Sequence, residues 1–456
     1  MREYTRELVH HLHGMNFSDF SEKTVETARI CVEDFIGVAL AGAEKKEAEI
    51  WRQYYAGKAT APEASVLRKG FGKQTVEQAA ALNAVAGHVM DLDDTHNASI
   101  THLAAITVPT ALALGQKLHR SGRQVLEAVA AGYEAGAKIG AAINPSAYKY
   151  WHTTAVAGPF AAGTTAAKLL GLTEEELLNC FGSAGSQAAG LWEFLKTGAM
   201  TKVLHTANAN LCGMRAAELA RLGFTGAPAI LEGERAFVRA MAKEYHLDRL
   251  VDFSQGPEID RNSIKAYACC RHTHSANFCV EQMLKDRPIV PEEIEGIEDR
   301  TYHTALETTD NPYPHTPYAA KFSLQFCLAA LLVTGSLNDR VFTEENLKNP
   351  AIQALMPRIR MIDDPEINEA FRQDPCRWTH DLTIRLKDGT ELHGRVDYPI
   401  GDFNNAFDRE MEDRKFDMLA DTLAEPVREE LKSRLHGLDK MEDISGLFDF
   451  KEEEST

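Results

Sequence analysis

Apolar residues recur at intervals of three and four along most of the first 260 positions, which is the spacing of an amphipathic helix. The alternation that marks a half-buried strand is almost absent there. Gly132, Gly136 and Gly140 lie four residues apart on one predicted helix face, so close helix packing is expected. We predict an all-helical region with helices over residues 3–43, 75–88, 110–119, 124–143, 153–170, 174–191 and 201–222.

The pattern changes after Gly256-Pro257. Residues 294–302 alternate like a strand, and residues 382–386 and 391–396 predict a hairpin because Asp388-Gly389 lies at the turn. This part is predicted to be a smaller α+β unit, and the chain is predicted to return to helix after it. Helical spacing recurs over residues 321–334, 344–355 and 408–435, whereas the charged residues 451–456 are expected to fray.

Charge and cysteine content narrow the functional classes. The formal net charge of -18 argues against nucleic acid or an anionic membrane as a partner, since both require a cationic face. Eight cysteines without disulfide-framework or zinc-ribbon spacing indicate reduced thiols. The first residues lack the apolar stretch of a signal peptide, and no apolar run approaches the ~18 residues of a membrane helix. The expected setting is the cytoplasm.

The strongest chemical signal lies between His88 and His102. Three carboxylates, the Thr95 hydroxyl and three imidazoles lie close together directly after an Ala- and Val-rich helix, without any Lys or Arg among them. Acid groups at the end of a buried helix indicate a reaction site because burial shifts their pKa values. Asp91 and Thr95 are four residues apart, so a continuing helix would place both on one face.

Three further polar clusters lie at the ends of predicted helices. They supply imidazoles for proton transfer and Lys and Arg for binding carboxylates. Motifs for phosphate loops, dinucleotide binding and His-Glu-x-x-His zinc sites are absent, and the cysteines and histidines of residues 269–274 do not match common zinc spacing, so neither cofactor nor metal is predicted. The clusters are Tyr148, Tyr150 and His152; Lys202 and His205; and residues 265–274, which include Arg271, His272 and His274.

Several of these motifs together resemble the MmgE/PrpD family, whose members include 2-methylcitrate dehydratase, cis-aconitate decarboxylase and iminodisuccinate epimerase. The similar segments are MDLDDTH at 90–96, MTKVLH at 200–205, GFTG at 223–226, KAYACC at 265–270 and KFSLQ at 321–325. The resemblance implies a homodimer with a cofactor-free site between two domains. It also implies that both chain ends form the large domain, so we predict an all-helical domain of residues 1–264 and 405–456 and an α+β lid of residues 265–404.

The resemblance also implies site residues. In this chain Leu103 follows His102 where relatives often have proline, and the spacing from Thr95 is one residue longer. Residues expected to contact substrate beside the catalytic ones are Asp94, His96, Tyr150, His205, Arg271 and His272. The family's active-site positions fall on Asp91, Thr95, His102, His152, Lys202 and His274.

The implied substrates are small di- and tricarboxylates. We hypothesise that a base removes a proton next to a carboxylate while cations stabilise the enolate-like charge. His102, His152 and His274 are candidate acids and bases, and Lys202 would bind a carboxylate. Asp91 would orient a histidine or carry a proton, and Thr95 would donate a hydrogen bond to the substrate. A hydro-lyase similar to 2-methylcitrate dehydratase is predicted, while an epimerase of an amino- or hydroxy-dicarboxylate, a cis-aconitate-type decarboxylase and a silent carboxylate-binding protein remain open.

Overall fold

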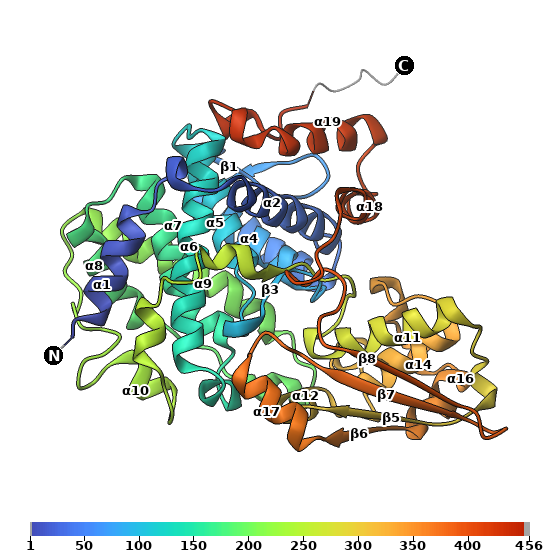
Figure 1. The fold of residues 1–456 in the computed structure, drawn as a ribbon. Helices are drawn as coiled ribbons and strands as arrows, with labels where there is room; N and C mark the ends of the chain where they lie inside the picture. Colours follow the sequence, from blue (N-terminus) through green and yellow to red (C-terminus); the bar gives the residue numbers. More distant parts are fainter. Residues whose placement is uncertain (1, 451–456) are drawn as a thin grey trace, which may run out of the picture.

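The computed structural model describes residues 2–450, so the predicted frayed tail at 451–456 lies outside the described residues. A large helical domain and a smaller domain with one four-stranded sheet make up the fold, as the sequence patterns predict (Figure 1). The helices of the first part are α1 Tyr4–Gly14, α2 Glu22–Gly42, α3 Lys46–Ala56, α4 Val76–His88, α5 Ala104–Lys117, α6 Gly122–Ile143, α7 Thr153–Leu170, α8 Glu174–Gly185, α9 Thr201–Arg221 and α10 Phe237–Met241.

Two predicted helix boundaries differ from those in the structure. The predicted helix over residues 3–43 is two helices, and Ser21, which the sequence indicates as an N-cap, caps α2 by accepting a hydrogen bond from the Thr24 backbone N–H at 3.1 Å. Helix α5 starts at Ala104, before Pro109 rather than after it. Proline cannot donate to the carbonyl four residues earlier, and the Asn210 side chain instead donates to the Ala105 carbonyl at 3.0 Å. Tertiary contacts therefore carry α5 through its proline.

The smaller domain is built on a sheet with the strand order β6-β5-β7-β8. Strands β5 and β6 are parallel and the other neighbours are antiparallel. The predicted hairpin is present between β7 and β8, with Gly389 at φ +88° in its turn. The strands are β5 Ile294–Thr301, β6 Ile359–Asp363, β7 His380–Leu386 and β8 Glu391–Val396.

Short helices cover this sheet. The predicted helix over residues 344–355 is split, because Pro350 takes the first position of a new helix that Asn349 caps. The helices are α11 His274–Asp286, α12 His303–Thr309, α13 Pro317–Ala320, α14 Leu324–Thr334, α15 Glu344–Leu347, α16 Pro350–Leu355 and α17 Pro365–Gln373.

The chain then returns to the large domain. The predicted helix over residues 408–435 is two helices, α18 Arg409–Leu419 and α19 Glu425–His436, and both pack on α2 (Figure 1). Lys415 of α18 pairs with buried Asp34 of α2 at 2.6 Å. The C-terminal segment is therefore anchored by a buried charge as well as by apolar contacts.

Helix α4 lies between two hydrophobic clusters. Ala79, Ala80 and Ala86 belong to the cluster of the helical domain, whereas Ala81 and Val85 belong to the cluster of the sheet domain. Small side chains on every face allow close packing on both sides. The residues that follow α4 are thereby delivered to the boundary between the two domains.

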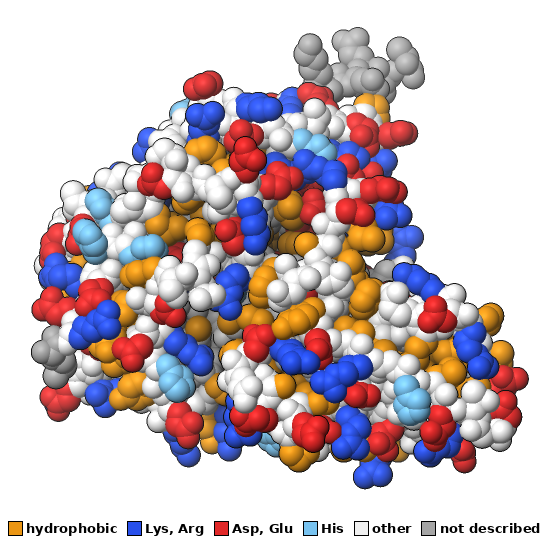
Figure 2. All heavy atoms as spheres, in the orientation of Figure 1, with side chains coloured by type: hydrophobic (Ala, Val, Ile, Leu, Met, Phe, Trp, Pro, Cys, Tyr) orange, Lys and Arg blue, Asp and Glu red, His pale blue; other side chains and the backbone are white. Residues whose placement is uncertain are grey.

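The glycines of α6 support the next segment of the same motif. A Cβ at Gly136 would overlap Leu103, and one at Gly140 would lie 2.8 Å from the Ser99 Cβ. The predicted close packing is thus present, although its partner here is the 99–103 segment as well as a helix. Within residues 2–450, none of the helices combines the length and apolarity that a bilayer crossing requires. Acidic and basic side chains are interleaved over the face in Figure 2.

Replacing Gly42 with alanine is expected to destabilise the fold. The new Cβ would overlap the Ala86 carbonyl group of α4, which is backbone and cannot rotate away. Overpacking of this kind costs about 1–3 kcal/mol. The free energy of unfolding, measured by urea denaturation, checks this. Gly57→Ala is the matched control, since nothing lies within 4 Å of its Cβ position; equal stability of both variants would contradict the packing account.

Candidate active site

The acidic motif forms a tight turn rather than an extension of α4. The helix ends at His88, and Asp91 has φ +54°, a left-handed conformation that costs energy for a residue other than glycine. Thr95 lies on the short strand β3 Thr95–His96, which pairs with β4 Asn262–Ser263. The prediction that Asp91 and Thr95 share a helix face is therefore wrong. The β3–β4 pairing instead brings Lys265 next to the motif.

Two ammonium groups share the Asp91 carboxylate. Lys202 Nζ donates to Asp91 Oδ1 at 2.6 Å, and Lys265 Nζ donates to the same oxygen at 2.9 Å. All three residues are at most 1% exposed. Burial alone would raise the pKa of Asp91, but the two ammonium groups hold it well below its usual range. Asp91 is ionised and binds lysines, whereas the sequence had led us to expect a histidine partner.

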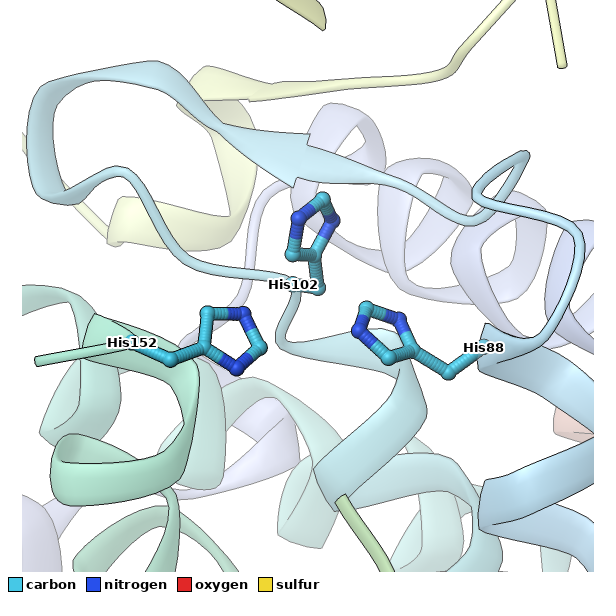
Figure 3. A group of neighbouring side chains, drawn as sticks. All are labelled: His88, His102 and His152. Carbon is cyan, nitrogen blue, oxygen red and sulfur yellow. The ribbon is translucent and has the colours of Figure 1, made fainter. Parts of the chain in front are cut away.

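Three imidazoles converge beside this ion cluster (Figure 3). His88 comes from the end of α4, His102 from the segment before α5, and His152 from the start of α7. One ring nitrogen from each lies within 4.8 Å of those of the other two. The three rings therefore form one group, built from segments up to 64 residues apart in the chain.

Each ring is held through Nδ1. His88 Nδ1 hydrogen-bonds Asp93 Oδ2 at 2.6 Å, and His102 Nδ1 donates to the Asp94 carbonyl at 2.7 Å. His152 Nδ1 lies 3.2 Å from His205 Nδ1, so one of this pair donates and the other accepts. An imidazole that donates through Nδ1 and is neutral carries a free lone pair on Nε2. His88 and His102 are thus oriented as bases.

Burial keeps these imidazoles neutral. It lowers the pKa of His88 and takes the pKa values of His102 and His152 well below the usual imidazole range. The Lys202 ammonium lowers all three further. Burial also lowers the pKa of His205 to about 4. At neutral pH the cluster presents uncharged proton acceptors beside two cations.

Several buried polar atoms of this region have no hydrogen-bond partner among the described residues. Such atoms are rare in native proteins, because each loses its hydration without compensation, and they indicate a polar ligand. Ring contacts connect several of the side chains that carry these atoms. The ring centroids of His152 and Trp192 are 4.8 Å apart, and the Tyr148 ring contacts the rings of both Trp192 and His272. The unpartnered atoms are His88 Nε2, Asp91 Oδ2, Asp93 Oδ1, His152 Nε2, Trp192 Nε1, His272 Nε2 and Tyr318 OH.

Other predicted site residues have structural partners. Asp94 accepts from Tyr133 OH at 2.7 Å, and burial raises its pKa to about 7. His96 contacts Ser99 and Glu258. Arg271 pairs with Asp402 at 3.0 Å. These three side chains stabilise the walls of the site.

The remaining predicted residues differ in their hydrogen-bond partners and in their exposure. His274 Nε2 hydrogen-bonds the Cys269 carbonyl at 3.2 Å, whereas His272 Nε2 has no partner among the described residues. Tyr150 is 55% exposed and lies outside the buried cluster. Thr95 Oγ1 lies 3.5 Å from His102 Nδ1, at the edge of the imidazole group.

The structure adds His88 and Tyr318 to the predicted site residues and brings in Lys265 from the predicted polar cluster of residues 265–274. His88, Lys265 and Tyr318 contribute an imidazole, an ammonium group and a hydroxyl to the cluster. His88 ends the helix directly before the acidic motif, so its position was a usable signal. Lys265 contacts a residue 174 positions away, and no local pattern shows that pairing.

The three imidazoles have the donor chemistry of a divalent transition-metal site. The positive charge of Lys202 nevertheless acts on all three rings and disfavours a second cation among them. A carboxylate ligand fits this combination of ammonium groups and neutral imidazoles better than a metal ion.

Sequence comparison identifies the fold family. The MmgE/PrpD N-terminal domain model matches residues 6–250, and the MmgE/PrpD C-terminal domain model matches residues 267–437. The chain belongs to the MmgE/PrpD family. The family resemblance of its motifs is thereby confirmed.

MmgE/PrpD relatives of two activities are similar to this chain. The cis-aconitate decarboxylase of Aspergillus terreus is 26% identical, over 98% of this chain and 95% of that protein. The human cis-aconitate decarboxylase is 24% identical, over 98% and 94% of the two chains. The mitochondrial 2-methylcitrate dehydratase of Yarrowia lipolytica is 24% identical, over 51% of this chain and 46% of that protein. A lyase class is therefore plausible for this family member.

Replacing Asp91 with asparagine should destabilise this MmgE/PrpD protein strongly. Asparagine tolerates the left-handed backbone, so the change removes the charge and leaves two buried ammonium groups without a counter-ion. Removing one partner of a buried pair costs about 3–5 kcal/mol. Urea denaturation measures the loss. Asp421→Asn, in a surface pair with Arg340, is the control, with an expected loss below about 1 kcal/mol; equal losses would contradict the account.

Proposed function

We propose that this protein is a lyase acting on a small di- or tricarboxylate, without a cofactor. The observation that supports this most is the pair of buried ammonium groups, Lys202 and Lys265, that share only the Asp91 carboxylate beside three neutral imidazoles. Neither lysine pairs with another carboxylate among the described residues. The nearby ionised Asp93 hydrogen-bonds His88 and neither lysine. Lys202 uses one of its three N–H donors and Lys265 uses two among the described residues, so both could still donate to a substrate carboxylate.

The proposed chemistry begins with proton removal by an imidazole. His88, His102 and His152 are neutral at pH 7, and a base must be unprotonated to accept the proton next to a carboxylate. Negative charge then develops on that carboxylate, and fixed ammonium groups stabilise it without reorganising. Lys202 and Lys265 take this role in the proposal, which extends the predicted role of Lys202 to a second lysine.

Elimination of water is the reaction that this geometry favours. After proton removal, the enolate-like intermediate expels hydroxide, which must gain a proton to leave as water. Burial raises the pKa of Tyr318 well above its ordinary value, so its unpartnered hydroxyl stays protonated and can donate to the leaving group. A neutral base and a protonated donor near one ion cluster suit a hydro-lyase of the 2-methylcitrate dehydratase type.

Decarboxylation is the second candidate, and a different observation favours it. The relatives named cis-aconitate decarboxylase match nearly the whole chain, whereas the Yarrowia relative named 2-methylcitrate dehydratase matches about half. A decarboxylase releases carbon dioxide and then protonates carbon, so the same cations would bind the remaining carboxylates. The two reactions differ in whether water or carbon dioxide leaves.

Product analysis in deuterium oxide separates these reactions. Citrate, 2-methylcitrate, cis-aconitate and iminodisuccinate analogues are incubated with the protein, and NMR identifies the products. A hydro-lyase gives an unsaturated acid with all carboxylates retained, a decarboxylase gives a shorter acid carrying one deuterium, and an epimerase exchanges deuterium without losing a group. His152→Gln should lower the turnover about 10²–10⁴-fold, whereas the exposed His393→Gln control should not change it. Binding of every acid without turnover would contradict the proposal.

The pH dependence tests the neutral imidazoles. Because their pKa values lie below the ordinary value of about 6.5, the bases stay unprotonated until the pH falls well under that value. The acid limb of kcat/KM should therefore lie below the ordinary imidazole value. An acid limb centred at or above about 6.5 would show that the essential base is an ordinary, solvated histidine.

A further inference from the structure

A second cluster of ionisable groups lies on the outer side of α2, away from the site described above. Glu33 belongs to α2, Asp413 to α18, and His436 is the last residue of α19. One oxygen of each carboxylate and one imidazole nitrogen all lie within 4.8 Å of one another. Three separate helices therefore converge here through side chains of metal-binding type.

The three converging atoms lack good hydrogen bonds. His436 Nε2 is 3.2 Å from Asp413 Oδ1 and 3.6 Å from Glu33 Oε1. Glu33 Oε1, Asp413 Oδ1 and His436 Nε2 nevertheless have no hydrogen-bond partner among the described residues. Glu33 is 3% exposed, so the cost of leaving its oxygen unpaired is that of a buried charge. The three atoms therefore converge without satisfying one another.

The spacing of these atoms matches the coordination of one ion. Zinc binds imidazole nitrogen and carboxylate oxygen at about 2.0–2.2 Å in tetrahedral geometry, which places neighbouring ligand atoms ~3.3–3.5 Å apart. The observed separations of 3.2 and 3.6 Å bracket that range. An ion at the centre would contact all three atoms, whereas a proton on His436 Nε2 could form a good hydrogen bond to only one of the two carboxylate oxygens.

Carboxylates outnumber guanidinium groups around this cluster. Arg29 pairs with Glu26 at 2.7 Å and with Glu33 at 2.5 Å, and Arg409 lies 3.3 Å from Glu26. The carboxylates are those of Glu26, Glu33, Glu412 and Asp413, facing two guanidinium groups. A divalent cation would reduce this excess.

We propose that Glu33 Oε1, Asp413 Oδ1 and His436 Nε2 bind a divalent transition-metal ion of the zinc type, with water completing the coordination. Such an ion would fasten α18 and α19 to α2. Lys415 of α18 also donates to the Leu92 carbonyl in the turn of the acidic motif. The bound ion would therefore stabilise one wall of the candidate active site from outside, without taking part in its chemistry.

Zinc binding by the full chain tests this proposal. Protein stripped with a chelator and desalted is titrated with Zn²⁺ in competition with a chromophoric chelator. The wild-type protein should bind one ion that His436→Asn and Asp413→Asn each weaken by ~10-fold or more. Both positions are about 30% exposed, so these variants are expected to fold, and circular dichroism verifies this. His119→Asn, in the surface pair with Asp443, is the matched control and should bind zinc like the wild type.

Two further measurements separate the alternatives. Zinc should raise the melting temperature of the wild-type protein but not that of His436→Asn; an ion pair alone predicts the same melting difference with and without zinc, which would overturn the proposal. His88→Asn distinguishes a metal ion held by the imidazoles of the candidate active site. If zinc binding were lost in His88→Asn and retained in His436→Asn, the proposed metal site at His436 would be wrong.

Discussion

Three lysines bind three successive backbone carbonyls in the turn after α4, and the candidate site depends on this clamp. Lys321 donates to the Met90 carbonyl at 2.6 Å, Lys265 to Asp91 at 2.9 Å, and Lys415 to Leu92 at 3.2 Å. Lys321 and Lys265 come from the C-terminal part of the chain around the sheet domain, and Lys415 comes from α18. Buried ammonium groups require such partners, because an unpaired one costs several kcal/mol.

The clamp explains why a strained turn persists between two domains. Asp91 adopts a left-handed conformation, which the surrounding structure must over-determine. Its carboxylate then accepts from Lys202 as well as Lys265, so the large domain and the later chain segment meet at one side chain. The same burial that makes these ion pairs strong keeps the nearby imidazoles neutral. Cation and base chemistry thus coexist within one small region.

The sequence predicts the parts of this arrangement that depend on local patterns. The largely helical first half, the Asp388-Gly389 hairpin and the N-cap at Ser21 follow from periodicity, turn chemistry and capping rules. The acidic motif as the centre of the site is predicted from composition. The helix break at Pro350 is not predicted, although the proline rule explains it. At Pro109 the prediction of a helix start is wrong, because the helix continues through the proline. The Asn210 side chain, 101 positions away, donates to the Ala105 carbonyl that proline leaves without a partner.

Long-range partnerships could not be predicted from the sequence. Arg271 and His96 have side chains that could bind a carboxylate substrate, but Arg271 pairs with Asp402 and His96 pairs with Glu258. The sequence places Lys265 and His272 in a predicted polar cluster, but only the fold shows that Lys265 pairs with Asp91 and that His272 contacts Tyr148. The family resemblance indicates Asp91, His152 and Lys202. The ion pair of Asp91 with Lys202 and the ring contacts of His152 with His88 and His102 show how the fold brings these distant residues together.

The central claim is that Lys202 and Lys265 form a carboxylate-binding pair that Asp91 only partly neutralises. Binding of an unreactive tricarboxylate, tricarballylate, tests it most directly, because affinity is measured without assuming a reaction. Isothermal titration of the wild-type protein, Lys202→Met and the exposed control Lys387→Met should show at least ~10-fold weaker binding for Lys202→Met alone, the size of one lost charge-assisted contact of about 1.5–3 kcal/mol. Equal affinity for all three proteins would contradict the account.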